Sequence, residues 1–508
     1  MNIIETMNFS ELLRGTGVAH SGGEVQVAGL DYNSRRVQPG WVFVAMYGDS
    51  TNGNRFIDAA LENGAVAVVT DSKHEHHRAH VPWAVVMDGR QALARMSANF
   101  YGRPAEKLKT IGITGTNGKT TTSFLCESIL RHCGMSSALI GTIEYHVAGR
   151  VLPAPHTTPE ALELNQIFAE AVSAGATHAV MEVSSHALVQ GRVWGIPYEV
   201  AVFTNLTRDH LDYHQDMQSY FEAKNILFNG CGSAPPKTAV INVDDEYGIQ
   251  LAQTRKSANE RVILYGIQSG DFRALDINLQ QDGTTFELIT PTGSRKMETA
   301  LIGGINVYNT LAAAAATYAC GCSLEQIAEA VRQFKQVPGR FEKVDCGQPF
   351  AVIVDYAHTD DALRNLTRVA REFVRRGVGT GRVITVFGCG GDRDRSKRPL
   401  MGLAAAQGSD FVVLTSDNPR SEDPQHIIAD ALTGLQKTTT RYSVEPDRAK
   451  AIRLALIEAM SGDMVLIAGK GHEKVQITRE GVFPFDDVQV ARQALEHLGY
   501  MACSGGPK

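Results

Sequence analysis

Short apolar runs alternate with helix-like stretches along most of this chain. In the middle of the sequence, three such runs lie at 178–183, 200–204 and 238–242. A strand with one face in water alternates apolar and polar residues, whereas a run that is apolar at almost every position is typical of a parallel strand covered on both faces. The pattern therefore predicts an α/β protein built on parallel sheets.

The first segment, residues 1–107, is predicted to be a separate N-terminal domain. It contains short apolar strands at 41–46 and 65–69 and a helix-like stretch at 56–61. Arg103-Pro104 has the composition of an exit linker. This segment carries no catalytic signature, so the residues alone indicate a small α/β domain for binding or packing.

Two further α/β domains are predicted, a central one at 108–337 and a Rossmann-like C-terminal one at 338–508. In the central segment, the Thr- and Gly-rich stretch at 262–301 predicts an antiparallel appendage, and Ala-rich helices at about 305–320 and 324–335 follow it. A chain of 508 residues is too long for a single core, which favours this division.

In the C-terminal segment, each predicted strand ends in a polar or glycine-rich cluster. The strands are expected at 350–355, 382–387, 410–415 and 463–468. The clusters that follow them are Asp355-Tyr356-Ala357-His358, Gly388-Cys389-Gly390-Gly391-Asp392-Arg393-Asp394, Ser416-Asp417-Asn418-Pro419-Arg420 and Gly469-Lys470-Gly471-His472-Glu473. Ligands of open parallel sheets bind beyond the carboxyl ends of the strands, so we expect the four clusters to share one crevice.

The strongest single motif is the octet Gly115-Thr116-Asn117-Gly118-Lys119-Thr120-Thr121-Thr122, between a predicted strand at 108–113 and a helix-like run at 123–130. Glycines let backbone N–H groups approach phosphate oxygens, and the helix N-terminus adds a favourable partial charge. Lys119 has the position of a lysine that reaches the outer phosphates. Ile113 stands where the full G-x-x-x-x-G-K-[ST] pattern has its first glycine, so this is a shortened variant of a P-loop-type ATPase motif.

Glu182, Thr120 and His210 of the central segment are candidates for a metal site beside this loop. Glu182 ends an apolar strand, and its carboxylate, with the Thr120 hydroxyl, supplies the oxygen ligands that Mg²⁺ prefers. His210 also follows a strand, but histidine is a less typical Mg²⁺ ligand, so a structural role is the simpler interpretation from the residues alone. Lys224 lies in a helix-like stretch, where a solvated lysine is the default expectation.

Composition and charge narrow the functional class. A net charge of −6 offers no basic footprint for nucleic acid, so no nucleic-acid partner is expected. The absence of an 18-residue apolar stretch predicts no membrane insertion, and the N-terminus lacks the features of a signal peptide. The eight cysteines form no C-x-x-C pair and are expected to be buried thiols in a cytoplasmic protein.

Across nearly its full length the chain resembles the Mur ligase family, whose motifs occur here in the family's order. They are Thr114-Gly115-Thr116-Asn117-Gly118-Lys119-Thr120, His156-Thr157-Thr158-Pro159, Glu182-Val183-Ser184-Ser185-His186, Thr204-Asn205-Leu206, Asp209-His210-Leu211-Asp212, Asn306-Val307-Tyr308-Asn309, Gly339-Arg340-Phe341-Glu342, Asp355-Tyr356-Ala357-His358 and Asp417-Asn418-Pro419-Arg420. The resemblance implies an N-terminal domain that binds a UDP-linked substrate, a central ATP-binding domain and a C-terminal domain that binds an amino acid.

The resemblance also implies roles in an ATP and Mg²⁺ site. The ATP-binding positions would be Gly115, Thr116, Asn117, Gly118, Lys119, Thr120, Thr121, Asn309, Arg340 and Asp355. The metal-site and catalytic positions would be Thr120, Lys119, Glu182, His210 and Lys224. Glu182 and His210 match the family's metal-site residues, which replaces the structural interpretation of His210. Lys224 matches the lysine that becomes a carbamate in this family and helps to position a second Mg²⁺.

The implied reaction adds meso-2,6-diaminopimelate to the D-glutamyl γ-carboxylate of UDP-N-acetylmuramoyl-L-alanyl-D-glutamate, through an acyl phosphate, in peptidoglycan biosynthesis. The positions that match the UDP-muramoyl-dipeptide site are Ser34, Thr157, Thr158, Ser184, Gln190 and Arg192. The positions that match the diaminopimelate site are Arg393, Asp417, Asn418, Pro419, Arg420, Gly469 and Glu473. His156 departs from close relatives, which often carry Asn before the Thr-Thr pair. A monomer is expected.

Arg420 bears on which amino acid is added. Diaminopimelate differs from lysine by a distal carboxylate, and the planar guanidinium of arginine suits bidentate binding of a carboxylate. The first alternative is the lysine-adding activity. Arg420 argues against it, because lysine-adding relatives usually lack this arginine. A folylpolyglutamate synthetase relative is disfavoured by the full N-terminal domain and by Asp417-Asn418-Pro419-Arg420. A non-catalytic nucleotide-binding protein is disfavoured by the intact Lys119, Glu182, His210 and Lys224.

Overall fold

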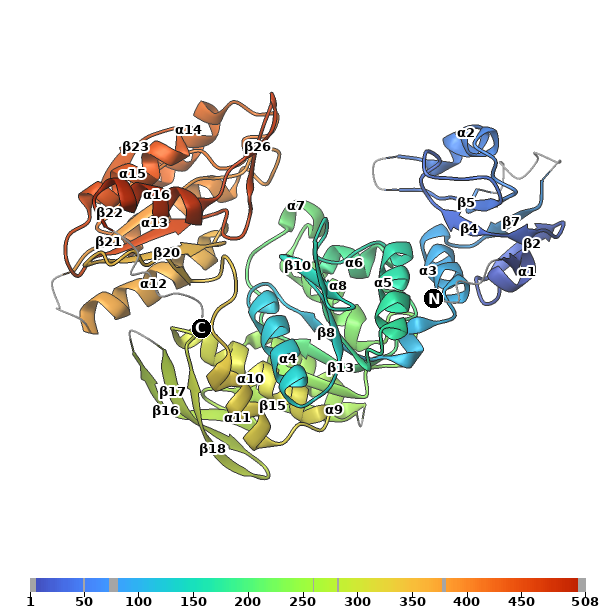
Figure 1. The fold of residues 1–508 in the computed structure, drawn as a ribbon, viewed down its shortest axis with the longest axis horizontal. Coiled ribbons are helices and arrows are strands. Elements are labelled where there is room, and N and C mark those ends of the chain that lie inside the picture. Colours follow the sequence, from blue (N-terminus) through green and yellow to red (C-terminus); the bar gives the residue numbers. More distant parts are fainter. Residues whose placement is uncertain are drawn as a thin grey trace.

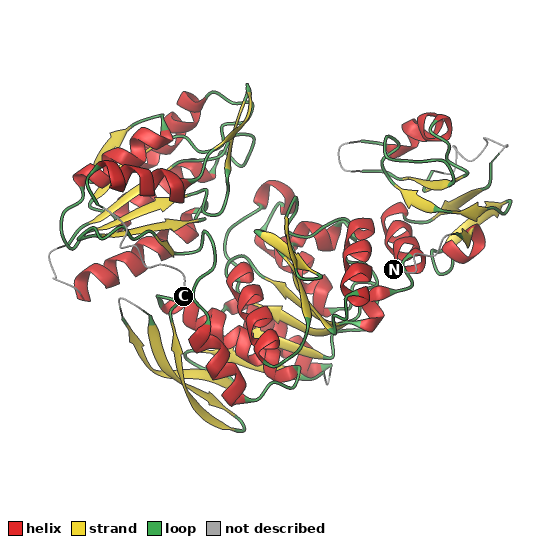
Figure 2. Cartoon of the chain, viewed as in Figure 1, coloured by secondary structure: helices red, strands yellow, loops and turns green. Residues whose placement is uncertain are grey.

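The computed structural model describes residues 6–48, 51–72, 81–258, 260–280, 283–376 and 381–500. It contains three large β-sheets, each covered by its own helices and following one another along the chain (Figure 1). Helices and strands alternate in all three parts (Figure 2). The predicted fold class, α/β with three domains, is confirmed.

The N-terminal part is built on a five-stranded sheet of order β2-β7-β6-β5-β4. Strands β4 to β7 run parallel, and β2 joins β7 in antiparallel register. The elements are β1 (Met7–Asn8), α1 (Phe9–Leu12), β2 (Val18–Gly22), β3 (Gln26–Val27), β4 (Gly29–Asp31), β5 (Trp41–Ala45), the 3₁₀ helix η1 (Gly53–Phe56), α2 (Ile57–Glu62), β6 (Ala67–Thr70), β7 (Trp83–Val86), α3 (Gly89–Phe100) and the 3₁₀ helix η2 (Pro104–Lys107).

The central part holds an eleven-stranded sheet of order β11-β10-β9-β12-β8-β13-β14-β15-β16-β17-β18. The elements are β8 (Lys109–Thr114), α4 (Lys119–His132), β9 (Ser137–Ile140), β10 (Glu144–Val147), β11 (Arg150–Pro153), α5 (Ala161–Ser173), β12 (His178–Glu182), α6 (Ser185–Val189), β13 (Tyr198–Phe203), α7 (Leu211–His214), α8 (Met217–Phe228), β14 (Thr238–Asn242), α9 (Glu246–Ser257), β15 (Val262–Gly266), β16 (Phe272–Leu279), β17 (Thr284–Thr290), β18 (Gly293–Thr299), α10 (Gly304–Ala319) and α11 (Leu324–Gln333). Its middle strands are parallel and buried, as the continuous apolar runs predict.

The stretch at 262–301 differs from the expected appendage. Strand β15 pairs in parallel with β14, and β16 pairs in parallel with β15, so both belong to the main sheet. Only β16, β17 and β18 form an antiparallel meander, and they extend the same sheet at its edge. Alternating residues predicted the antiparallel pairing, but the register that joins β15 to β14 depends on contacts between strands that periodicity does not reveal.

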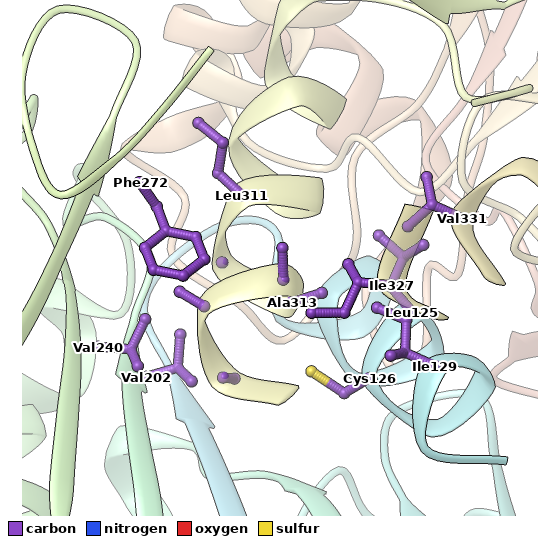
Figure 3. Close-up of a cluster of buried hydrophobic side chains, with 14 of the residues drawn as sticks. Leu125, Cys126, Ile129, Val202, Val240, Phe272, Leu311, Ala313, Ile327 and Val331 are labelled. Atoms are coloured by element: carbon purple, nitrogen blue, oxygen red, sulfur yellow. The ribbon is translucent and has the colours of Figure 1, made fainter. Parts of the chain in front are cut away.

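Helices α4, α10 and α11 cover one face of the central sheet, and their side chains form a continuous apolar core (Figure 3). Leu125, Cys126 and Ile129 of α4 belong to this core together with Leu311 and the small residue Ala313 of α10, and all are buried. Small side chains allow close approach of the two helices. As a result, the N-terminal ends of α4 and α10 border the same cavity.

The C-terminal part is a doubly wound sheet of order β19-β20-β24-β21-β22-β23, in which all strands except β19 are parallel. Helices α12 to α14 cover one face, and α15 and α16 cover the other. The elements are β19 (Glu342–Lys343), β20 (Ala351–Asp355), α12 (Asp360–Arg376), β21 (Val383–Phe387), α13 (Lys397–Gly408), β22 (Phe411–Leu414), α14 (Pro424–Leu435), β23 (Arg441–Val444), α15 (Arg448–Glu458), β24 (Met464–Ala468), β25 (Val475–Thr478), β26 (Gly481–Pro484) and α16 (Asp487–His497). Within the described ranges, no helix combines the length and apolarity needed to cross a membrane.

Candidate active site

The first four residues of the octet, Gly115 to Gly118, form a tight loop between β8 and α4. Gly115 has φ +146°, and a Cβ atom there would lie 1.8 Å from Thr204 Oγ1, so only glycine fits. Gly118 has φ +87°, and a Cβ atom there would lie 2.4 Å from Asn309 Oδ1. This left-handed residue lets α4 begin at Lys119, earlier than the helix-like run at 123–130 indicated.

The Lys119 ammonium bends back over the loop and donates to the carbonyl oxygens of Gly115 and Thr116, each at 2.8 Å. Burial lowers the pKa of Lys119, and the charge of Glu182 opposes this effect. An ammonium held among backbone carbonyls by such bonds can exchange them for phosphate oxygens without a change in the loop.

The residues proposed to bind Mg²⁺ include a close pair of oxygen donors. Thr120 Oγ1 lies 3.1 Å from Glu182 Oε2, and Arg340 Nη2 donates to the same hydroxyl at 3.1 Å. Glu182 is fully buried and accepts from the backbone N–H and the hydroxyl of Thr142, at 2.8 and 2.9 Å. A hydroxyl and a carboxylate are hard ligands, so the chemistry of this pair fits Mg²⁺.

His210 borders the same cavity as Glu182, on the segment that precedes α7 (Leu211–His214). Its side chain is 43% exposed, and its Nε2 lies 3.5 Å from Asp209 Oδ2. Burial opposes ionisation of Asp209, but the charges of His210 and Lys397 hold the pKa of this carboxyl well below its usual range. Among the described residues, no group of three or more His, Cys, Asp or Glu side chains could hold a metal. Mg²⁺ commonly takes only one or two carboxylates, with waters and phosphates completing its shell.

Lys224 is not the solvated helix lysine that its neighbours in sequence suggest. Its side chain on α8 is 1% exposed, and Nζ donates to the carbonyl of Gly115 at 2.9 Å. Nζ also lies 4.4 Å from the centre of the Tyr220 ring. Burial, together with the positive charge of Lys119, lowers the pKa of Lys224 well below its usual value.

The cavity beside the loop has a volume of about 310 Å³ and is bordered by both the central and the C-terminal parts. Asn309 of α10 lies on its central wall and donates to Asn306 Oδ1 at 2.9 Å. On the opposite wall, the Arg340 guanidinium stacks 4.4 Å above the Tyr356 ring. Asp355 accepts from two backbone N–H groups, and burial raises the pKa of its carboxyl. All of the positions predicted for ATP except Gly115 therefore line one cavity.

Four of the six positions predicted for the UDP-muramoyl dipeptide are joined by hydrogen bonds, and a fifth lies beside them. Thr158 Oγ1 donates to the carbonyl of Glu182 and accepts from Ser184 N–H. Arg192 donates to the carbonyl of Thr158 at 3.0 Å and to Gln190 Oε1 at 3.0 Å. Thr157 lies beside them, with its hydroxyl 3.2 Å from the hydroxyl of Thr142.

Ser34, the sixth position, lies apart in the N-terminal domain. Arg36 and Tyr32, its neighbours in sequence, both reach Glu163 on α5 of the central part, at 3.0 and 3.1 Å. The side chain of His156 is exposed, and its backbone carbonyl accepts a hydrogen bond from the Tyr145 hydroxyl.

The residues predicted to bind the amino acid gather at the carboxyl ends of β22 and β24. Asn418 Nδ2 donates to Glu473 Oε2 at 2.7 Å, and Asn418 Oδ1 accepts from Lys470 at 2.8 Å. Arg420 has φ +53° and donates to the carbonyl of Gly391 at 2.7 Å. Gly469 has φ +118°, and a Cβ atom there would lie 2.5 Å from Asp417 Oδ2, so these two positions are in contact.

Arg393 and Pro419 complete this set. A Cβ atom on Gly390 would lie 3.7 Å from Arg393 Cγ and 3.1 Å from Arg420 Nη1, so both arginines flank Gly390. The side chain of Arg393 is exposed, whereas Pro419 is buried. The strand-end rule therefore placed these residues together, although they come from three separate loops.

Sequence reasoning missed several residues of the site. Thr142 follows β9 and binds Glu182 twice, but no motif marks it. Lys397 of the C-terminal part pairs with Asp209 of the central part. Lys470 lies within a noted cluster but received no role, and its burial could not be read from a Gly-rich sequence. The only available signal was its place at a strand end.

Models of the Mur ligase family match most of the chain. Residues 26–101 match the "Mur ligase family, catalytic domain", residues 113–317 the "Mur ligase middle domain" and residues 339–471 the "Mur ligase, glutamate ligase domain". The chain belongs to the Mur ligase family. The unmatched stretches between these segments are residues 102–112 and 318–338.

Two curated relatives show how close the likeness to other Mur ligases is. The UDP-N-acetylmuramoyl-L-alanyl-D-glutamate--2,6-diaminopimelate ligase of Solibacter usitatus is 52% identical over 97% of this chain and 99% of its own length. The protein of that name in Geobacillus thermodenitrificans is 47% identical over 94% and 96%. A solved structure of a ligase with this name has a TM-score of 0.66 and 36% identity, over 94% of this chain and 96% of that one.

Proposed function

We propose that this Mur ligase family member joins meso-2,6-diaminopimelate to the D-glutamyl γ-carboxylate of UDP-N-acetylmuramoyl-L-alanyl-D-glutamate, with ATP converted to ADP and phosphate. The observation that carries the proposal is the strand-end cluster of Asn418, Arg420 and Glu473. It combines a guanidinium for a distal carboxylate with a carboxylate for the adjacent ammonium. Full-length relatives at 52% and 47% identity bear the name of this activity.

In the first step, the γ-carboxylate attacks the γ-phosphorus of ATP, which gives an acyl phosphate and ADP. Two anions must approach each other, so the site has to neutralise charge. Lys119 and Arg340 both bond to atoms of the octet. Lys224 also bonds to the carbonyl of Gly115, but its pKa is lowered well below the usual value. We assign Lys119 to the outer phosphates of ATP and Arg340 to charge that develops during transfer.

Thr120 and Glu182 would hold Mg²⁺, with His210 as a further ligand on the same cavity. When bound, Mg²⁺ supplies positive charge to the phosphates and fixes their orientation. A carbamate on Lys224 would add an oxygen ligand for a second ion. The low pKa of this buried lysine supports that assignment, because only an unprotonated amine reacts with CO₂.

In the second step, the amine of the amino acid attacks the acyl carbon, a tetrahedral intermediate forms, and phosphate leaves. Water must be kept out because it would hydrolyse the acyl phosphate. Contacts between the central and C-terminal domains support a closed arrangement for this step. Asn117 donates to Asp361 at 3.0 Å, and Lys397 pairs with Asp209.

ADP release tests the proposal directly. The purified protein is given ATP, Mg²⁺ and the UDP-muramoyl dipeptide, with meso-diaminopimelate, L-lysine or no amino acid. We expect release that depends on meso-diaminopimelate and a product of tripeptide mass. Faster release with L-lysine would identify the lysine-adding activity instead. Release that needs folate and glutamate in place of the UDP substrate would identify a folylpolyglutamate synthetase.

A further inference from the structure

A buried lysine lies beneath the amino-acid cluster. Lys470 follows β24 and is 0% exposed. Its ammonium donates to Asn418 Oδ1 at 2.8 Å and to Glu473 Oε2 at 3.1 Å, and it lies 4.0 Å from Asp417 Oδ1. A buried ammonium is costly unless it is paired and hydrogen-bonded, so these partners account for its position.

The bonds of Lys470 leave Asn418 only one orientation of its amide. Asn418 Oδ1 accepts from both Lys470 and the backbone N–H of Ile477, the latter at 3.0 Å. Asn418 Nδ2 must therefore face the other way, and there it donates to Glu473 Oε2 at 2.7 Å. A flipped amide would set an NH₂ group against an ammonium and another N–H donor.

The same bonds give the two carboxylate oxygens of Glu473 different surroundings. Oε2 accepts from both Asn418 and Lys470, on the buried side of the cluster. Oε1 takes part in neither bond, and the Glu473 side chain is 27% exposed. One oxygen of this carboxylate is thus anchored, and the other remains available to a ligand from the solvent side.

We infer that Lys470 is a positioning residue for the incoming amino acid, which it serves by orienting Asn418 and anchoring Glu473. The inference rests on the proposed function, because it names the ammonium of diaminopimelate as the group that Glu473 Oε1 meets. Because Lys470 is 0% exposed, it acts through these two side chains and not by direct contact with the substrate. A lysine that only supported the fold would affect all three substrates alike, whereas a positioning lysine affects the amino acid alone.

The experiment measures KM for each substrate in Lys470→Met. We expect KM for meso-diaminopimelate to rise about 10- to 100-fold, since the variant leaves buried acceptors without their charged donor. KM for ATP and for the UDP substrate should stay within about 2-fold, because the partners of the Lys470 ammonium, Asn418, Glu473 and Asp417, all belong to the amino-acid cluster. Lys470→Arg keeps the charge and should recover part of the loss. Lys474→Met is the matched control, because that exposed lysine pairs with Asp486 outside the cluster.

A double-variant cycle tests whether Lys470 acts through Glu473. In a Glu473→Gln background the carboxylate is already gone. The factor by which Lys470→Met raises KM for diaminopimelate should then be smaller than in the wild type, by about 5-fold or more. An equal factor in both backgrounds overturns the inference, as does an equal rise in all three KM values. Should Lys470→Met fail to fold, Lys470→Gln, which keeps an N–H donor, is judged by the same ratios.

The wild-type control separates this inference from the proposed function. If the wild-type protein forms no product with meso-diaminopimelate, the proposed function fails, and the inference about the ammonium fails with it. If the wild type uses diaminopimelate and Lys470→Met has an unchanged KM for it, only the inference about Lys470 is wrong.

Discussion

The ammonium of Lys224 donates a hydrogen bond to the carbonyl of Gly115, the first glycine of the phosphate loop, at 2.9 Å. This bond joins helix α8 to the loop, across more than a hundred residues of sequence. The lysine is buried, and its pKa is lowered by that burial and by the nearby charge of Lys119. A lowered pKa favours the unprotonated amine, the form that reacts with CO₂, so Lys224 offers a direct test of the proposed metal site.

Replacing Lys224 with alanine should leave the protein folded but nearly inactive. The loss should be at least about 100-fold in kcat, because a ligand that positions charge in the transition state disappears. Short carboxylic acids should restore part of the activity if a carbamate is the missing group. Lys237→Ala, which removes an exposed lysine, is the control. A high-resolution map in bicarbonate that shows an unmodified ammonium would contradict the carbamate.

Lys119→Ala tests the assignment of the loop to ATP. Its ammonium bonds only to loop carbonyls here, so its removal should spare the fold. We expect kcat to fall at least about 100-fold, since the charge is needed chiefly while the phosphoryl group moves. Lys109→Ala, at the exposed start of β8, the strand that leads into the loop, should retain normal turnover. Near-normal kcat in Lys119→Ala would show that the assignment of the loop to ATP is wrong.

The amino-acid cluster also depends on a buried ion pair behind it. The side chains of Arg448 and Asp487 are both 0% exposed and are joined by two hydrogen bonds, at 2.8 and 2.7 Å. Arg448 also donates to the carbonyls of Ser416 and Ala468, the residues just before Asp417 and Gly469. Both strand ends of the site are therefore attached to one guanidinium.

Arg448→Met should destabilise the C-terminal domain by about 3–5 kcal/mol, because it leaves Asp487 as an uncompensated buried charge. The double variant Arg448→Met, Asp487→Leu should recover much of that loss. Native-state hydrogen exchange of β22 and β24 is the appropriate measurement, since three domains do not unfold as one unit. Arg441→Ala, which removes an exposed arginine, is the control. Equal protection in Arg448→Met and wild type would show that the pair contributes little.

Much of the site was predictable because strand ends meet in a parallel sheet. Asn418 and Glu473 are far apart in sequence, yet the rule that ligands bind beyond the carboxyl ends of strands predicted their proximity. The octet predicted a phosphate loop because glycine, lysine and threonine each serve a distinct physical purpose there. Motif resemblance then added roles for His210 and Lys224 that their residue types alone did not suggest.

The remaining features depend on burial, which the sequence does not display. Lysine and arginine are usually solvated and seldom fully buried, so the sequence alone suggests that Lys470 and Arg448 lie on the surface. Their partners lie on other strands and helices, so only the packed structure identifies them. Thr142 was not predicted for a related reason. It follows β9, and its partner Glu182 ends the neighbouring strand β12, which is far away in sequence.

Arg420 carries the prediction about amino-acid choice. Its guanidinium donates to the carbonyl of Gly391, flanks Gly390 and lies 3.5 Å from the carbonyl of Asn418, whose side chain bonds to Glu473. We expect the distal carboxylate of diaminopimelate to pair with this guanidinium and the adjacent ammonium to pair with Glu473. An unpaired carboxylate in a closed crevice costs roughly 2–5 kcal/mol, or about 30- to several-thousand-fold in specificity.

Arg420→Ala should therefore lose most of its kcat/KM for meso-diaminopimelate, whereas the already low kcat/KM for L-lysine should fall much less. The ratio of the two should collapse even if activity with lysine stays poor. Arg420→Lys should recover only part of the preference, since an ammonium cannot reproduce the bidentate fork. Arg479→Ala is the matched control, because this exposed arginine reaches Ser421 on the same loop. An equal fall for both amino acids in Arg420→Ala would mean that Arg420 serves folding or general catalysis, and that selection of diaminopimelate lies elsewhere.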